Sequence, residues 1–310
     1  MPHFKAFLVL LYKGIKVRTI YNMAYQQMVF RFKNSNEYEY YFLGEFGAKG
    51  EKRTKRRKKT KEEIARANQL RKEKNTRRLI KANFSEKDYW VTLKYPAGTR
   101  ISIDEVKDDK KYFLKEMRKN YKKHGCALKW ICRLEIGSKG GIHMHVIVNR
   151  IKNADTDVCL QECWDRTLAH SFKRRGRNAP DRRGYVDYEL LYDSGDYEAL
   201  AKYITKKPEK DSEEYEQLSL FEKEEQKTLQ TVTTSKNLIR PEAEKKDFSH
   251  RTVRRMIKEG PTPTPGYYIV QDSIQHGINP FTGYSYLMYT EKRINPIKTG
   301  HQPDIERGIP

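Results

Sequence analysis

The segment from about residue 85 to 208 alternates short apolar runs with amphipathic stretches, and this order limits the folds open to the chain. Runs typical of strands lie at residues 89–95, 128–136, 142–149 and 185–191. Apolar residues at helical spacing lie at about 104–124, 155–172 and 196–207. The order βαββαβ plus a helix predicts an α+β fold of ferredoxin-like type, an antiparallel sheet of about five strands with helices on one face. The other sheet face would be free for a ligand.

The regions on either side of this predicted catalytic domain, 85–208, differ in composition. Residues 1–50 are rich in Tyr and Phe and predict one or two strands of unknown role. Residues 51–84 predict a basic helical arm. Residues 209–230 are charged with few apolar positions and predict a linker or mobile loop. Residues 231–310 predict a small C-terminal unit with a hairpin around a Gly-Ile-Asn-Pro-Phe-Thr-Gly turn.

The formal net charge of +22 over 310 residues attracts polyanions, of which nucleic acid is the commonest. A basic run precedes a helix whose start is marked by Thr60 and Glu63 at capping-box spacing. Because like charges repel each other unless a polyanion neutralises them, we predict an arm that contacts DNA phosphates. A solvated charged face is the alternative. The predicted DNA-binding positions are Lys52, Arg53, Lys55, Arg56, Arg57, Lys58, Lys59, Arg174, Arg175 and Arg177.

The four cysteines fit no compact zinc-finger or haem spacing and predict reduced, mostly buried thiols. Cys159 and Cys163 would share a helix face, which leaves a zinc site as the weaker alternative. The apolar run from Phe7 to Tyr12 is too short to span a bilayer, and no signal cleavage site follows it. We therefore expect an intracellular protein with no membrane partner. The sequence contains no glycine-rich loop ending in Gly-Lys-Ser/Thr, so ATP hydrolysis is not expected.

The run GGIHMHVIVN carries the most informative polar side chains. Because side chains of a strand alternate, His143 and His145 share one face while Met144 and Val146 point to the other. The apolar set must face the helices, which puts both imidazoles on the free face. Two neutral imidazole nitrogens placed in this way can hold one metal ion. The alternative is that both histidines are polar surface residues.

A carboxylate on the preceding strand is expected to join the two histidines. There the apolar positions alternate with Arg133 and Glu135, and residues 137–141 form a hairpin connection to the next strand. We predict that Glu135 reaches the same ion as His143 and His145. Two imidazoles and a carboxylate leave coordination positions open, which a metal needs to act as a Lewis acid on phosphate.

The helix EALAKYITKK supplies a candidate nucleophile, Tyr203. Lys206 and Lys207 follow it by three and four residues, so either amine would project near the phenol. A phenol with a pKa of about 10 is a poor nucleophile at neutral pH and needs nearby positive charge. The alternative is that Tyr203 packs with its apolar neighbours. Tyr197, six residues earlier, is rotated off this face and predicted to be core.

Three motifs in this order resemble those of HUH endonucleases, in particular rolling-circle replication initiators of phages and integrative elements. The motifs are Thr92 with Leu93 and Tyr95, then Glu135 with His143-Met144-His145, then Tyr203 with Lys206. The similarity covers about residues 66–241, although Lys94 stands where such proteins usually carry Thr. The resemblance implies the HUH nuclease fold, Mg2+ or Mn2+ on the histidines and a carboxylate, and a 5′-phosphotyrosyl link to Tyr203.

The resemblance also implies a metal-dependent DNA endonuclease and strand transferase with a single catalytic tyrosine. It would nick single-stranded or hairpin origin DNA and rejoin the ends, with a separate helicase and polymerase as partners. The expected location is the cytoplasm of a bacterial host, with a phage or mobile element as the source. Two alternatives stay open: a non-catalytic nucleic-acid-binding module, whose binding would survive chelation, and a relaxase or single-tyrosine transposase of the same superfamily.

Overall fold

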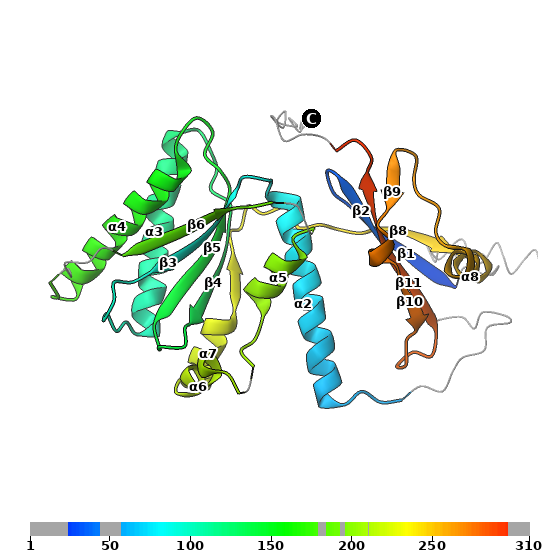
Figure 1. Ribbon diagram of the computed structural model, residues 1–310, viewed down its shortest axis with the longest axis horizontal. Coiled ribbons are helices and arrows are strands. Elements are labelled where there is room, and N and C mark those ends of the chain that lie inside the picture. Colours follow the sequence, from blue (N-terminus) through cyan, green and yellow to red (C-terminus); the bar gives the residue numbers. More distant parts are fainter. Residues whose placement is uncertain (1–23, 44–56, 179–183, 193–195, 210, 297–310) are drawn as a thin grey trace, which may run out of the picture. The chain divides into compact units, whose positions relative to one another are not determined.

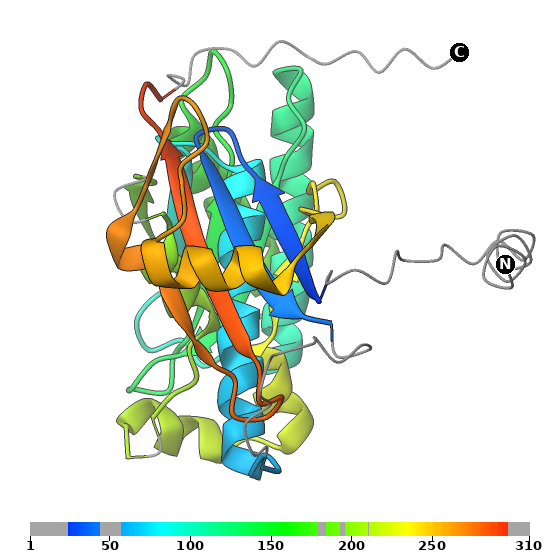
Figure 2. The same cartoon turned by 90° about the vertical axis from the view of Figure 1, so that its right-hand side faces the viewer.

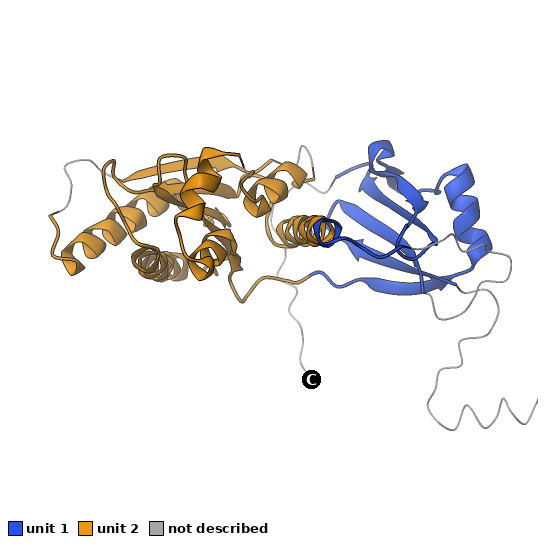
Figure 3. Cartoon of the chain, turned by 90° about the horizontal axis from the view of Figure 1, so that it is seen from below, with its two compact units in different colours: residues 1–64, 241–300 blue, residues 65–240, 301–310 orange. Residues whose placement is uncertain are grey.

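The computed structural model describes residues 24–43, 57–178, 184–192, 196–209 and 211–296. The chain divides into two compact units (Figure 3). The terminal unit comprises residues 1–64 and 241–300, and the central unit comprises residues 65–240 and 301–310. Each unit contains one antiparallel sheet. In the described part of the chain, no helix is both long enough and apolar enough to cross a membrane.

The central unit contains a five-stranded sheet in the order β6-β3-β5-β4-β7, with all neighbours antiparallel. Its strands are β3 (Tyr89–Lys94), β4 (Trp130–Ile136), β5 (Ile142–Val148), β6 (Tyr185–Leu190) and β7 (Val232–Thr234). The helices that directly follow β3, β5 and β6 are α3 (Ile103–Lys123), α4 (Thr156–Arg174) and α5 (Glu198–Thr205). The α+β class and the antiparallel sheet of about five strands predicted from the sequence are confirmed.

Helices α3 and α4 cover one face of this sheet (Figure 1). Ser102 begins α3 with a capping box to Glu105. Phe113 of α3, Trp164 of α4 and Met144 of β5 are completely buried in the core between these layers. The side of β5 that bears Met144 therefore faces the helices, as its alternation predicted.

A smaller apolar cluster lies on the opposite sheet face. Here Ile131 and Ile147 of the sheet pack with Ile80 of α2 (Lys61–Asn83) and Ile204 of α5. Figure 1 shows α5 and α2 on the side of the sheet away from α3 and α4. These helices cover the Ile147 end of the face that the sequence analysis left free. The start of α2 follows prediction, because Thr60 and Glu63 exchange reciprocal hydrogen bonds.

The prediction of a linker or mobile loop at 209–230 was wrong. The segment contains α6 (Glu213–Ser219) and α7 (Lys223–Gln230), and Leu218 and Leu229 are buried in the core of the central unit. One apolar anchor for each short helix is enough to hold the segment against the sheet, although its overall composition is charged. Strand β7 follows directly and pairs with β4.

The terminal unit joins strands from both ends of the chain. Its sheet has the order β10-β11-β2-β1-β8, and β9 also pairs with β11. The elements are β1 (Tyr25–Arg31), β2 (Ser35–Phe42), β8 (Glu244–Phe248), α8 (His250–Glu259), β9 (Tyr267–Ile269), η1 (Gln271–Ser273), β10 (Gln275–Ile278) and β11 (Ser285–Arg293). Helix α8 crosses one face of the sheet (Figure 2). The predicted hairpin is confirmed as β10 and β11, whereas the pairing of β2 with β11 was not foreseen.

Arg175 was predicted to bind DNA, but the structure places it in an interior ion-pair network. Its guanidinium lies 3.0 Å from Asp109, which is 1% exposed, and 2.9 Å from Glu105. Tyr95 and Ser171 also donate hydrogen bonds to Asp109. Arg175 therefore ties α4 to α3 instead of presenting its charge to a ligand.

We predict that Arg175→Met lowers the free energy of unfolding by about 3 kcal/mol, because it leaves the buried Asp109 carboxylate without its cation. Arg174→Met is the matched control. Its own ion pair with Asp108 is exposed to solvent, so this variant should change stability little. Urea unfolding of both variants measures the difference, and equal effects would contradict the structural role of Arg175.

Candidate active site

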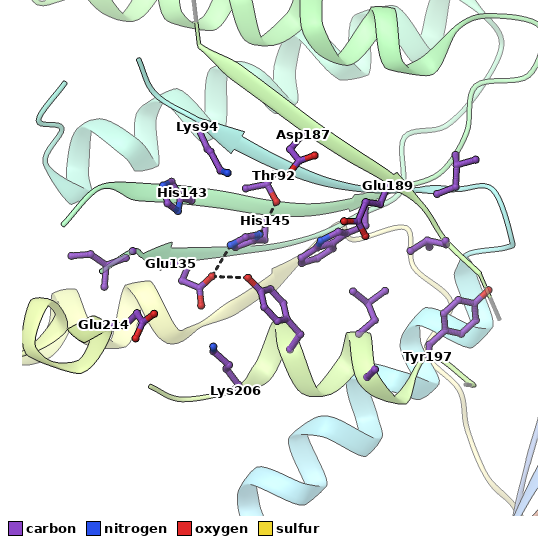
Figure 4. Close-up of a pocket in the computed structure, with 18 of the residues that line it drawn as sticks. Thr92, Lys94, Glu135, His143, His145, Asp187, Glu189, Tyr197, Lys206 and Glu214 are labelled. Carbon is purple, nitrogen blue, oxygen red and sulfur yellow. Dashed lines mark hydrogen bonds and ion pairs between the residues drawn. The ribbon is translucent and has the colours of Figure 1, made fainter. Parts of the chain in front are cut away.

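A cavity of about 860 Å³ opens on the sheet face of the central unit opposite α3 and α4 (Figure 4). Residues of β3, β4, β5 and β6 form its floor, and α5 contributes a wall. The cavity brings together Glu135, His143, His145, Tyr203 and Lys206, which the sequence placed on two separate motifs. Lys207 does not line it.

His145 occupies the centre of this floor. Its Nδ1 lies 3.1 Å from the Thr92 hydroxyl, and its Nε2 lies 2.6 Å from Glu135 Oε2. The contact with Glu135 lacks hydrogen-bond alignment, so Nε2 is a buried nitrogen with no hydrogen-bond partner among the described residues. Thr92 thus fixes the ring through one nitrogen and leaves the other nitrogen beside a carboxylate. An imidazole nitrogen and a neighbouring carboxylate oxygen can together bind a divalent cation.

His143 lies on the same face of β5 but turns its ring over the 137–141 hairpin. A Cβ added to Gly137 would lie 3.0 Å from His143 Cε1, so the absence of a side chain there makes room for the imidazole. In the described residues, no group of three or more His, Cys, Asp and Glu side chains is arranged to hold a metal ion. The structure therefore brings His145 and Glu135 into contact, and His143 lines the same cavity without completing a ligand set.

The charges around the cavity favour a neutral His143 and an ionised Glu135. Burial lowers the pKa of His143, and nearby His145 and Lys94 act in the same direction. Burial raises the pKa of Glu135, but His145, Arg133 and Lys206 together hold that pKa below its usual value. An unprotonated imidazole and a carboxylate are the forms that bind metal.

Tyr203 projects from α5 toward this pair. Its hydroxyl lies 3.3 Å from Glu135 Oε2, and its ring meets those of Trp90 and His145 edge-on at 5.7 and 5.5 Å. The Trp90 and His145 rings stack with an interplanar angle of 5°. The side chain is still 41% exposed, so a substrate can reach it. Burial and the neighbouring Glu135 raise the pKa of Tyr203 to about 12.

The two lysines after Tyr203 are arranged differently from the prediction. Helix α5 ends at Thr205 instead of continuing to residue 207, because Lys206 adopts an extended ψ of 151°. Lys206 Nζ nevertheless lies 5.5 Å from the centre of the Tyr203 ring. Because α5 ends before Lys207, helical spacing does not bring Lys207 onto the face of Tyr203.

The C-terminal end of α5 is held by two side chains from outside the helix. Arg133, which is 3% exposed, donates to the carbonyls of Tyr203 and Ile204 at 3.2 Å each. Gln69 of α2 donates to the carbonyl of Thr205 at 2.9 Å. The last carbonyls of a helix have no partner within it, so these donors satisfy them and fix the position of the Tyr203 backbone.

Helix α2 also holds the other end of α5. Lys81 lies 2.8 Å from Asp196, with Arg77 at 3.6 Å from the same carboxylate. Tyr197 follows with φ 57° and is buried in the second core cluster, which confirms its predicted core position. The predicted DNA arm thus has a structural role over its C-terminal half.

The remaining predicted DNA contacts have varied positions. Lys52, Arg53, Lys55 and Arg56 lie outside the described residues. Arg57 pairs with Glu63, and Lys59 lies 4.5 Å from the centre of the Phe281 ring, while Lys58 is exposed. Arg174 and Arg177 are about half exposed and stay predicted contacts.

Sequence reasoning missed several residues of the site. Trp90 and Asp187 line the cavity from the neighbouring strands, and Glu214 does so from the segment predicted to be a linker. Strand alternation had placed Arg133 on the correct face but suggested no role for it. Asp187 lies opposite Thr92 in the β3–β6 register, so a correct strand pairing could have found it.

Comparison with known families returns one match in this region. Residues 88–208 match the family model described as replication-associated protein ORF2/G2P. The match starts just before β3 and ends just after α5, so it includes both histidines, Glu135 and Tyr203. It is consistent with a protein of rolling-circle replication. No curated protein and no solved structure matched the chain.

We predict that Arg133→Met loosens α5, because the carbonyls of Tyr203 and Ile204 lose their buried donor. Amide exchange of the peptide containing residues 198–205 should accelerate about tenfold, as expected for a loss of about 1.4 kcal/mol. Lys202→Met, on the exposed side of the same helix, is the control and should leave exchange unchanged. Equal exchange in both variants would show that Arg133 does not anchor the helix.

Proposed function

We propose that this chain is a rolling-circle replication initiator that nicks single-stranded origin DNA with Tyr203. The observation that carries the proposal is the contact of the Tyr203 hydroxyl with Glu135, which itself lies beside His145. This contact supports the proposal, because it brings the Tyr203 hydroxyl close to the two groups proposed to bind a cation, at one point of an open cavity. The match of residues 88–208 to a replication-associated family supports DNA as the substrate.

The composition of the cavity supports a role for a cation. Two lysines line it against five carboxylates: Glu135, Asp187, Glu189, Glu198 and Glu214. A phosphate that enters meets an excess of negative charge, even though the whole chain has a net charge of +22. His145 and Glu135, joined by His143 once its ring turns from the hairpin toward them, would hold Mg2+ or Mn2+, which when bound polarises a phosphate oxygen as a Lewis acid.

The remaining residues orient the nucleophile. The Tyr203 oxygen attacks phosphorus and loses its proton, and the DNA 3′ oxygen leaves and takes up a proton. The product is a 5′-phosphotyrosyl bond with a free 3′ hydroxyl. Rejoining is the reverse attack by a 3′ hydroxyl and needs no ATP, because the phosphotyrosyl bond conserves the energy of the broken ester. Trp90 and His145 confine the phenol ring, and Lys206 supplies positive charge beside it.

We predict that Tyr203→Phe binds DNA but forms no covalent product, because only the hydroxyl can link to phosphorus. The protein is incubated with 3′-labelled single-stranded DNA of randomised sequence and Mn2+, then denatured and separated by size. Tyr188→Phe removes an exposed phenol that does not line the cavity and serves as control. A labelled adduct that persists in Tyr203→Phe would rule out this nucleophile.

We predict that His145→Ala and Glu135→Gln each reduce Mn2+-dependent cleavage by about 100-fold or more. DNA affinity should change little, because backbone contacts from Lys and Arg supply most of it. Cleavage rates are measured against Mn2+ concentration, with His170→Ala, an exposed histidine outside the cavity, as control. Cleavage at the wild-type rate in limiting Mn2+ would remove that residue from the ligand set. DNA binding that survives chelation without any cleavage would favour a non-catalytic binding module.

A further inference from the structure

The terminal unit contains a second cavity, of about 570 Å³, that belongs neither to the catalytic proposal nor to the matched family segment. It lies between the sheet and α8, the helix that crosses this sheet in Figure 2. Tyr38 and Tyr40 of β2 and Tyr289 and Glu291 of β11 line it from the sheet. Helix α8 and the segment after it line the other side.

Glu291 is the unusual group in this cavity. It is 1% exposed, and its Oε1 accepts hydrogen bonds from the backbone N–H and the hydroxyl of Thr264, at 2.9 and 3.3 Å. Its Oε2 has no hydrogen-bond partner among the described residues. A buried acceptor without a donor is unfavourable, so the cavity is suited to a ligand that brings an N–H group to this oxygen.

The walls around Glu291 are aromatic. Tyr38 and Tyr289 stack with ring centres 4.7 Å apart and planes at 12°, and Tyr40 stacks beside Tyr289 at 6.2 Å. Proteins line sites for unpaired nucleobases with aromatic side chains, and carboxylates accept hydrogen bonds from the amino groups of those bases. A base with an exocyclic amine meets both requirements of the cavity.

The helix beside the cavity is suited to hold a phosphate backbone. Arg255 lines the cavity, and the other exposed basic residues of α8 are Arg251, Arg254 and Lys258. Glu259 is the one opposing charge that α8 contributes to the lining. Phosphate contacts from this helix would bring affinity, while the contact with Glu291 would bring base preference.

We propose that the terminal unit binds single-stranded DNA, taking one unpaired base with an exocyclic amine into the tyrosine-lined cavity, where Glu291 Oε2 accepts its hydrogen bond. Thymine lacks this amine. Its ring N–H lies between two carbonyl oxygens, which a carboxylate repels. The site therefore discriminates cytosine from thymine although both bases are pyrimidines. This binding does not depend on nicking by Tyr203.

The test compares oligothymidylate with the same oligonucleotide carrying one central cytosine. Binding to the full chain is measured by fluorescence anisotropy in the presence of a chelator, which prevents metal-dependent cleavage. Both probes carry the same number of phosphates, so nonspecific binding contributes equally to them. We expect the cytosine probe to bind about tenfold more tightly to the wild-type protein. Equal affinities would overturn the proposal.

Glu291→Gln tests whether the preference arises in this cavity. The amide oxygen still accepts the hydrogen bonds of Thr264, and the amide N–H donor points into the cavity. This donor suits a carbonyl of thymine instead of the amine of cytosine. The preference for cytosine should disappear while affinity for oligothymidylate is kept. Glu259→Gln removes a carboxylate from the same cavity and should keep the preference. A cytosine preference that survives Glu291→Gln would place base recognition elsewhere.

Discussion

The two faces of strand β5 lie in different environments, because successive side chains of a strand point to opposite faces. Its Met144 side packs into the core under α3 and α4, while its His145 side forms the floor of the cavity. The antiparallel neighbours place Thr92 and Arg133 directly across from His145. A slip of one residue in this register would turn the histidines toward α3 and α4 and the core side chains toward the cavity, so the site depends on the pairing.

The position of Tyr203, the proposed nucleophile, depends on anchors outside its own helix. Helix α5 has eight residues, too few to be stable in isolation. Arg133 and Gln69 hold its last carbonyls, and Lys81 holds Asp196 just before its first turn. Arg133 is two residues from Glu135 on the same strand face, so β4 supplies both an anchor for the Tyr203 backbone and the carboxylate that contacts the Tyr203 hydroxyl. Residues of this one strand thus contact both the backbone and the side chain of Tyr203.

Local periodicity explains what could be predicted from the sequence. The facing of Glu135 and His145, the core position of Tyr197 and the capping box of α2 all depend on residues close together in the chain. The joining of β2 to β11 could not be predicted in this way, because it pairs residues about 250 positions apart. The helices at 213–230 were missed because their charged composition hid the two leucines that anchor them.

The orientation of His143 shows a second limit. Strand alternation assigns a side chain to a face but not to a rotamer, so both histidines share a face while only His145 contacts Glu135. Arg175 shows the same limit for charged residues, because a basic residue near a helix end can form ion pairs in the interior as well as on the surface. In both cases tertiary partners decide the role of the side chain.

Mapping of the DNA-linked residue shows whether Tyr203 is the nucleophile. The covalent product formed with single-stranded DNA and Mn2+ is digested with a protease, and the nucleotide-bearing peptide is sequenced by mass spectrometry. We expect one modified residue, Tyr203. A nucleotide on Tyr188, Tyr192 or Tyr197, or no covalent product from any tested single-stranded DNA, would contradict it.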